Sequence, residues 1–97
     1  MADQIRITPE QMITRAGEYK TQADVVEGVI KKMDTLLAAL REEWEGESSE
    51  AYEERYLKLR PHFVTAYDLI TEISDKLKTV ANRSEQTDKE IADQFRG

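Results

Sequence analysis

The sequence predicts an all-α protein, a helix-turn-helix hairpin of two long antiparallel helices that is expected to dimerise. Two series of apolar residues, spaced alternately four and three apart, run through the two halves of the 97-residue chain. Such spacing places apolar side chains on one stripe of a helix. The tripeptide Trp44-Glu45-Gly46 separates the two series and leaves room only for a tight turn. We interpret residues 1–97 as a single helical-hairpin domain.

The first helix is predicted over residues 8–43, after a lead-in at residues 1–7. Thr8 can cap the helix, Pro9 suits its first position, and Gln11 completes a capping box. Gly46 is expected to end this helix. Its apolar stripe continues for more than four heptads and consists of Met12, Ala16, Tyr19, Ala23, Val26, Ile30, Met33, Leu37, Leu40 and Trp44.

Residues 44–48 form the predicted turn, and the second helix is predicted over residues 49–83. Ser48 or Ser49 is the expected N-cap, followed by glutamates that complement the helix dipole. Pro61 interrupts the pattern without changing its phase, so we expect a kinked but continuous helix. The stripe consists of Tyr52, Tyr56, Leu59, Phe63, Ala66, Ile70, Ile73, Leu77 and Val80.

The last segment, residues 84–97, is predicted to be a flexible or partly helical tail. If the two helices pair backwards from the turn, the first helix offers the second no further partner residues beyond about residues 82–85. The apolar stripe passes at that point through Ser84 and Thr87 before it reaches Ile91. A tail beyond the paired region is therefore expected to fray or to engage another surface.

Both predicted helices carry further apolar residues beside the stripe. A hairpin needs only the narrow stripe, so a wider face indicates a second neighbour. At about 25 cal/mol per Å², leaving such a face in water would forfeit several kcal/mol, a large part of a small domain's stability. We therefore predict a dimer interface at Val25, Val29, Leu36, Leu57, Val64 and Tyr67.

Composition argues against several classes of function. The formal net charge of −6 disfavours nucleic acids and anionic membranes, because both attract basic surfaces. Cysteine is absent, which excludes disulfides, thiolate metal sites and thiol nucleophiles. No apolar run is long enough to predict a transmembrane helix. The first residues lack the basic and apolar regions of an ordinary signal peptide.

The sequence offers little chemistry. His62 is the only histidine, with no second histidine or cysteine to complete a metal site. Residues 42–54 contain seven glutamates and no basic residue, but lack the alternating ligands of a calcium loop. Carboxylates on exposed helices have no dry pocket to raise their pKa. We therefore predict no enzymatic activity, no cofactor, no metal site and no small-molecule substrate.

Trp44 permits two interpretations. It falls on the apolar stripe, which indicates a core residue that closes the end of the hairpin. The helix ends there, however, so part of the indole can remain exposed beside the turn. Exposed tryptophan is a common anchor for recognition by another protein.

The central Trp44-Glu45-Gly46, between two long helical segments in a chain of this length without cysteine, resembles the WXG family. These are the ESAT-like (early secretory antigenic target) proteins of type VII secretion, and the resemblance covers the whole chain. It implies dimerisation into an antiparallel four-helix bundle and an export or recognition role for Trp44 and Gly46. Family members often carry Tyr-x-x-x-Asp/Glu after the second helix. None of the four tyrosines here has an acid four residues later.

The resemblance implies a secreted, non-enzymatic substrate or effector of a type VII (ESX/Ess) secretion system that acts through protein contacts. Such a protein is cytoplasmic before export and leaves without a cleaved signal peptide. Its implied partners are a second copy in a homodimer or a related WXG-type chain, and an FtsK/SpoIIIE-type secretion ATPase. The alternative is a cytoplasmic helical adaptor or assembly protein in which the Trp-x-Gly turn is accidental.

Overall fold

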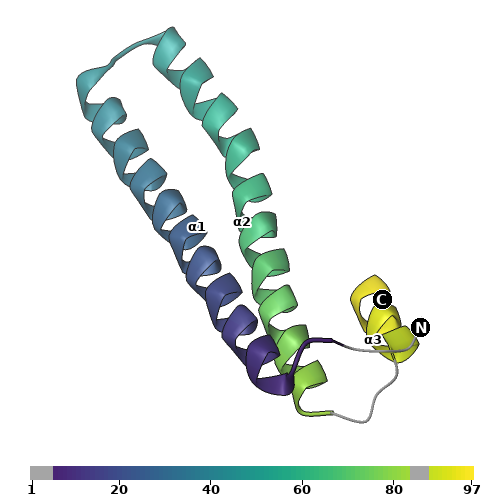
Figure 1. The fold of residues 1–97 in the computed structure, drawn as a ribbon. Coiled ribbons are helices and arrows are strands. Elements are labelled where there is room, and N and C mark those ends of the chain that lie inside the picture. The colour runs from purple at the N-terminus through teal and green to yellow at the C-terminus, as the bar shows by residue number, and fades with distance from the viewer. Residues whose placement is uncertain (1–5, 84–87) are drawn as a thin grey trace. The chain divides into compact units, whose positions relative to one another are not determined.

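The protein is a helical hairpin followed by a short third helix. The computed structural model describes residues 6–83 and 88–97. Within them, α1 (Pro9–Glu43) and α2 (Glu47–Ala81) are the two arms of the hairpin, and α3 (Asp88–Arg96) follows (Figure 1). The predicted all-α hairpin is confirmed. Parts of the predicted lead-in and tail, residues 1–5 and 84–87, lie outside the described residues.

Both long helices contribute to two compact units. One unit comprises residues 1–22 and 69–97, and therefore contains the start of α1, the end of α2 and α3. The other comprises residues 23–68 and contains the α1–α2 turn. The expectation of a single domain stays a prediction.

A reciprocal capping box begins α1, as the sequence predicts. The Thr8 backbone N–H donates to Gln11 Oε1 at 2.8 Å, and the Gln11 N–H donates to Thr8 Oγ1 at 3.1 Å. Pro9 is the first helical residue, where its missing N–H costs no helical hydrogen bond. These bonds satisfy backbone donors that a helix start otherwise leaves without partners.

The turn is shorter than predicted. α1 ends at Glu43 and α2 begins at Glu47, two residues before the predicted start, so only residues 44–46 connect the helices. Gly46 has a φ of 115° and its carbonyl oxygen accepts hydrogen bonds from the Ser49 N–H at 3.1 Å and Ser49 Oγ at 2.8 Å. Gly46 therefore precedes the second helix directly, a position that the sequence analysis gave to a serine.

The second arm is one continuous helix that contains Pro61. Its continuity was predicted, but it ends at Ala81, two residues before the predicted boundary. The Asn82 and Arg83 backbone N–H groups still donate to the carbonyls of Lys78 and Val80. Part of the predicted tail is helical, because α3 occupies residues 88–96.

The side of α2 that faces α1 differs from the predicted stripe. In the unit around the turn, Ile30, Leu37 and Tyr56 are buried as expected. Tyr52 and Leu59, by contrast, are each 44% exposed. Tyr19, a stripe residue in the other unit, is also exposed. The prediction was therefore wrong at these three positions.

Polar side chains occupy the inward positions next to the exposed ones. Two such side chains, Glu53 and Arg60, are half-buried. They directly follow the exposed apolar residues Tyr52 and Leu59 in the sequence. In the other unit the corresponding position is Ser74, which is 1% exposed. Each of these side chains bonds to α1, at Arg41, Asp34 and the Ala16 carbonyl. At these positions the inward side chain is therefore polar and lies one residue further along the chain, while Tyr56 and Val80 of the predicted stripe are buried.

The unit that holds the termini has a small apolar centre. Met12, Val80 and Ala81 form a buried cluster, and Ile91 of α3 packs against it. Ser74 Oγ donates to the Ala16 carbonyl oxygen at 2.7 Å, and the fully buried Ala16 leaves room for that close contact. Lys76 Nζ donates to the Gln94 carbonyl oxygen at 2.6 Å, near the end of α3.

Candidate recognition site at the α1–α2 turn

An aromatic pair lies at the turn. Trp44 follows the last residue of α1, and Tyr52 lies in the second turn of α2. Their ring centroids are 5.8 Å apart and the ring planes are tilted by 49°. Trp44 is 36% exposed and Tyr52 44% exposed. The indole is therefore held by a neighbouring ring while about a third of its surface stays in contact with solvent.

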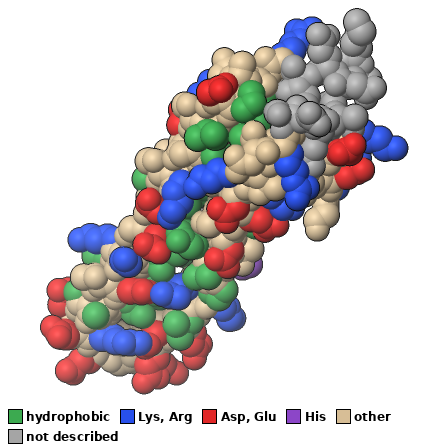
Figure 2. Space-filling model, turned by 90° about the horizontal axis from the view of Figure 1, so that it is seen from below, with side chains coloured by type: hydrophobic (Ala, Val, Ile, Leu, Met, Phe, Trp, Pro, Cys, Tyr) green, Lys and Arg blue, Asp and Glu red, His purple; other side chains and the backbone are tan. Residues whose placement is uncertain are grey.

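The sequence around this aromatic pair is rich in carboxylates. Five exposed glutamates flank it in the sequence: Glu42, Glu43, Glu45, Glu47 and Glu50. Acidic side chains also gather at the lower left of the face in Figure 2. The nearest preceding basic residue, Arg41, forms an ion pair with Glu53. The turn therefore combines an apolar centre with a negative surround.

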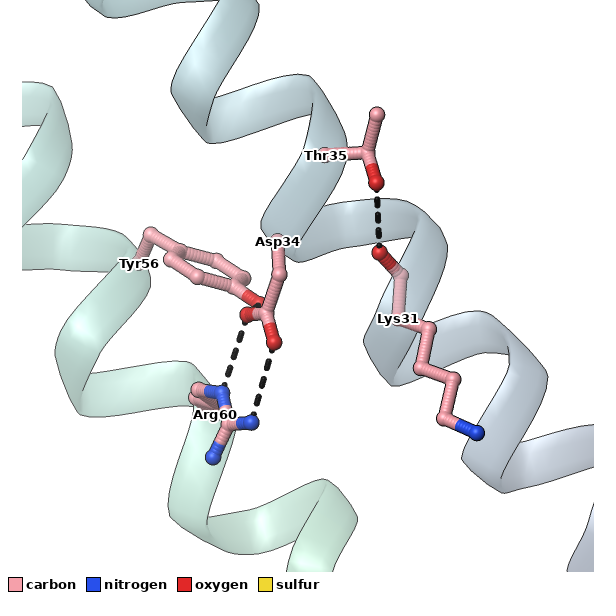
Figure 3. A network of polar contacts seen from close by, with 5 residues as sticks. All are labelled: Lys31, Asp34, Thr35, Tyr56 and Arg60. Atoms are coloured by element: carbon pink, nitrogen blue, oxygen red, sulfur yellow. Dashed lines mark hydrogen bonds and ion pairs between the residues drawn. The ribbon is translucent and has the colours of Figure 1, made fainter.

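A polar network joins the two helices further from the turn (Figure 3). Asp34 of α1 accepts hydrogen bonds from Arg60 Nε at 2.9 Å, Arg60 Nη2 at 3.0 Å and the Tyr56 hydroxyl at 2.5 Å. The bonds from Arg60, and then from Tyr56, lower the pKa of Asp34 to about 2. Burial, followed by the bond to Asp34, raises the pKa of Tyr56. Asp34 is thus a carboxylate over the physiological pH range.

These contacts fix how the helices pair. Two ion pairs, Asp34–Arg60 and Arg41–Glu53, join the helices, and the sequence midpoint of each is Glu47. Antiparallel helices require such a shared midpoint. A bidentate arginine–carboxylate contact has a defined geometry, so a slip of one helix past the other would break it. The sequence analysis missed both pairs because it treated charged residues as solvent-facing. The signal in the sequence that could have predicted these ion pairs is that residues of opposite charge lie at equal distances from the turn.

The predicted dimer-interface residues differ in exposure. Val25, Val29, Leu36 and Leu57 are exposed, whereas Val64 and Tyr67 are half-buried. All six belong to the unit around the turn. Figure 2 shows hydrophobic side chains at the surface of one face, interspersed with charged ones. Exposed aliphatic side chains are therefore present on both helices of this unit.

Helical geometry separates five of these six residues into two groups. At about 100° per residue, Val25, Val29 and Leu36 are separated from Asp34 by roughly 140–180° around α1. Asp34 and Arg60 meet on one side of the hairpin, so the three α1 residues lie away from that side. Leu57 and Val64, three residues before and four residues after Arg60, share the side of α2 that carries Arg60. By this geometry Val25, Val29 and Leu36 are expected on the other side of the hairpin from Leu57 and Val64, and the dimer interface stays a prediction.

Other potential sites show no convergent chemistry. In residues 6–83 and 88–97, no group of three or more histidine, aspartate or glutamate side chains is arranged to hold a metal ion. His62 is exposed. A solvent-open depression of about 460 Å³ lies at the start of α1 and is lined by Arg6, Ile7, Glu10, Gln11, Thr14 and Arg15. None of the helices in the described part of the chain has the length and apolarity to cross a membrane.

The fold and the turn define a class of protein, namely small all-α hairpins with a Trp-x-Gly sequence between their two long helices. Residues 4–89 match the WXG100 family model, described as proteins of 100 residues with WXG. The chain belongs to this family. It is a secreted ESAT-6-like protein of the type VII secretion kind, in a family of small WXG proteins that are not known enzymes.

Named relatives agree with this assignment. The chain is 36% identical to protein YukE of Bacillus subtilis over 97 residues, which cover 100% of both chains. It is 31% identical to the ESAT-6-like protein SAG1039 of Streptococcus agalactiae over 94 residues, covering 97% of this chain and 98% of the relative.

Solved structures show the same fold. Geobacillus thermodenitrificans EsxA is similar, with a TM-score of 0.77, 37% identity and coverage of 95% of this chain and 99% of that one. Bacillus anthracis EsxB, described as a secreted protein, gives a TM-score of 0.78 at 24% identity, covering 87% of this chain and 90% of that one. At that identity, the second similarity supports the fold alone.

Proposed function

We propose that the protein is a non-enzymatic substrate of a type VII secretion system, exported without a cleaved signal peptide and cytoplasmic until then. It acts through protein contacts, as a dimer and export partner. The observation that carries this proposal is the turn: Trp44 is partly exposed, Tyr52 supports it, and Gly46 sets the chain reversal. Half-exposed aromatic side chains on a rigid frame are typical recognition anchors.

The secretion ATPase is the partner that this turn is proposed to serve during export. The hydrogen bonds of the turn support such a role, because a preorganised anchor loses little entropy on binding. Gly46 reverses the chain, and its carbonyl oxygen accepts two hydrogen bonds from Ser49. Trp44 is therefore held beside α2 before any partner arrives.

The dimer partner is proposed to be a second copy of the chain or a related WXG-type chain. Val25, Val29 and Leu36 of α1 are exposed, and Leu59 of α2 is exposed too. In an antiparallel pair, the side of α1 that carries Leu36 lies next to the side of α2 that faces away from Leu57. Leu59 lies on that side of α2. We therefore place the dimer face on Val25, Val29, Leu36 and Leu59, on the other side of the hairpin from Leu57 and Val64.

Replacement of Trp44 by alanine tests the export role. The variant is expected to keep its helicity and its dimer mass, since Trp44 lies after the last turn of α1. Its amount in the culture supernatant is expected to fall to background while the cellular pool accumulates. Circular dichroism, light scattering and immunoblots of both fractions measure these quantities.

Two outcomes would contradict the proposal. Normal export of the Trp44→Ala variant would show that the motif has no role in secretion. Retention of the unaltered protein inside cells, whether or not the secretion ATPase is present, would instead favour a cytoplasmic helical adaptor.

A further inference from the structure

The aromatic pair at the turn includes a residue outside the family tripeptide. Trp44 belongs to the motif, but Tyr52 is six residues beyond Gly46 and lies on another helix. Tyr52 is as exposed as an isolated surface tyrosine such as Tyr19, with 44% and 43% of their surfaces accessible. Its ring nevertheless contacts Trp44 at a centroid distance of 5.8 Å. Two large rings thus present one apolar surface to solvent.

The charges around this surface restrict what can cover it. Residues 42–54 contain seven glutamates and no lysine, arginine or histidine. The Glu53 carboxylate is already paired with Arg41, but Glu42, Glu45 and Glu47 are exposed. An acidic or uncharged apolar partner would gain nothing from that surround, and an anionic membrane would be repelled by it. A partner with basic groups around an apolar slot would be attracted and oriented.

We propose that Trp44 and Tyr52 together form a docking surface for a protein partner that offers an apolar slot with a basic rim. The two rings fill the slot, and the exposed glutamates meet lysine or arginine side chains around it. Buried aromatic anchors supply most of the affinity in such contacts, while rim charges set the encounter rate and the orientation. The inference rests on the proposed export role and adds to it a second anchor residue and the chemistry of the partner.

The aromatic half of the proposal is tested by Tyr52→Ala, with Tyr19→Ala as the matched control. Both replacements remove one exposed tyrosine ring from a long helix, but only Tyr52 contacts Trp44. Tyr52→Ala is expected to lower the protein in the supernatant about tenfold or more, the size of loss typical of an anchor residue. Tyr52→Phe, which keeps the ring, is expected to restore export, and Tyr19→Ala to leave it unchanged.

The charge half is tested by two triple variants that change the net charge equally. One variant has lysine in place of Glu42, Glu45 and Glu47. The other has lysine in place of three exposed acidic residues elsewhere, Glu10, Asp68 and Asp75. The first is expected to lose export at least as strongly as Tyr52→Ala, because lysines would face the basic rim. The second is expected to be exported normally. Circular dichroism and light scattering confirm the helicity and mass of every variant.

Each contrary result overturns a defined part of the inference. If Trp44→Ala blocks export but Tyr52→Ala does not, the docking surface does not include Tyr52, although the export role of the motif stands. If Tyr52→Ala lowers the dimer mass, the ring belongs to the dimer interface and the inference is wrong. If both triple variants are exported equally, the partner has no basic rim. If Trp44→Ala itself is exported, the proposed function fails.

Discussion

At the scale of single residues, Gly46 holds a backbone conformation that side chains with a Cβ atom seldom adopt. Its φ is 115°, while nothing lies within 4 Å of the position that a Cβ would occupy. The constraint is therefore conformational and not steric. Replacement of Gly46 by alanine is expected to destabilise the protein by about 1–3 kcal/mol, measured by urea unfolding.

Gly28→Ala is the matched control for this change. Gly28 lies within α1, is exposed, and also has open space at its Cβ position. Alanine there is expected to stabilise the helix by about 0.5–1 kcal/mol, since glycine is the weaker helix former. Equal effects of the two alanines would contradict the assigned role of the Gly46 conformation.

Asp34 makes stability depend on pH at the acidic end of the scale. Its pKa is lowered from 3.8 to about 2 by the bonds from Arg60 and Tyr56. A lowered pKa in the folded state adds stability that is fully present above the unfolded value and is lost as pH falls through the folded value. The contribution of Asp34 should therefore disappear between about pH 4 and pH 2.

The Asp34→Asn variant is expected to lack this part of the acid dependence. Thermal unfolding followed by circular dichroism at several pH values between 2 and 5 would measure it. The wild-type melting temperature should fall more steeply than that of the variant over this range. Parallel curves for the two proteins would show that the Asp34 network does not persist in solution.

At the scale of helices, the sequence predicted the capping box, the end of α1 and the continuity of α2 through Pro61. These features depend on local signals, namely cap residues and an unbroken apolar rhythm. The inward position of polar side chains on α2 could not be predicted in the same way. It depends on Ser74 reaching the Ala16 carbonyl and on Arg60 reaching Asp34, contacts between residues far apart in the chain.

Candidate-site prediction relied on local motif and spacing, and the recognition role of Trp44 and Gly46 stays a prediction. Trp44 and Gly46 were identified from the tripeptide and its position between two helices. Tyr52 was assigned to the core because it fits the apolar spacing, yet it is exposed and contacts Trp44. Periodicity alone does not show that the inward stripe is shared with polar residues.

The short helix α3 is expected to depend on its contact with the hairpin ends. A helix of nine residues is marginal in water on its own. Ile91 packs against the cluster of Met12, Val80 and Ala81, so Ile91→Ala should raise amide exchange throughout α3 while the middle of α1 and α2 stays protected. The exposed Lys89→Ala is the control. Unchanged protection in Ile91→Ala would contradict this dependence.

At the scale of the whole molecule, we expect one side of the hairpin to mediate association. Leu36 and Leu57 are exposed to similar extents but lie on opposite sides. Leu36→Glu is expected to dissociate the dimer, because it would bury a charge in an apolar interface. Leu57→Glu should leave the mass unchanged at micromolar concentration in light scattering. The reverse result would move the interface to the side that carries Arg60.

The export claim is tested most directly by following the unaltered protein in cells with and without the secretion ATPase. Immunoblots of supernatant and cell fractions, with a cytoplasmic marker to monitor lysis, supply the measurement. We expect protein in the supernatant of cells that have the ATPase and none above the lysis marker in cells that lack it. Equal amounts in both supernatants, or none in either, would contradict it.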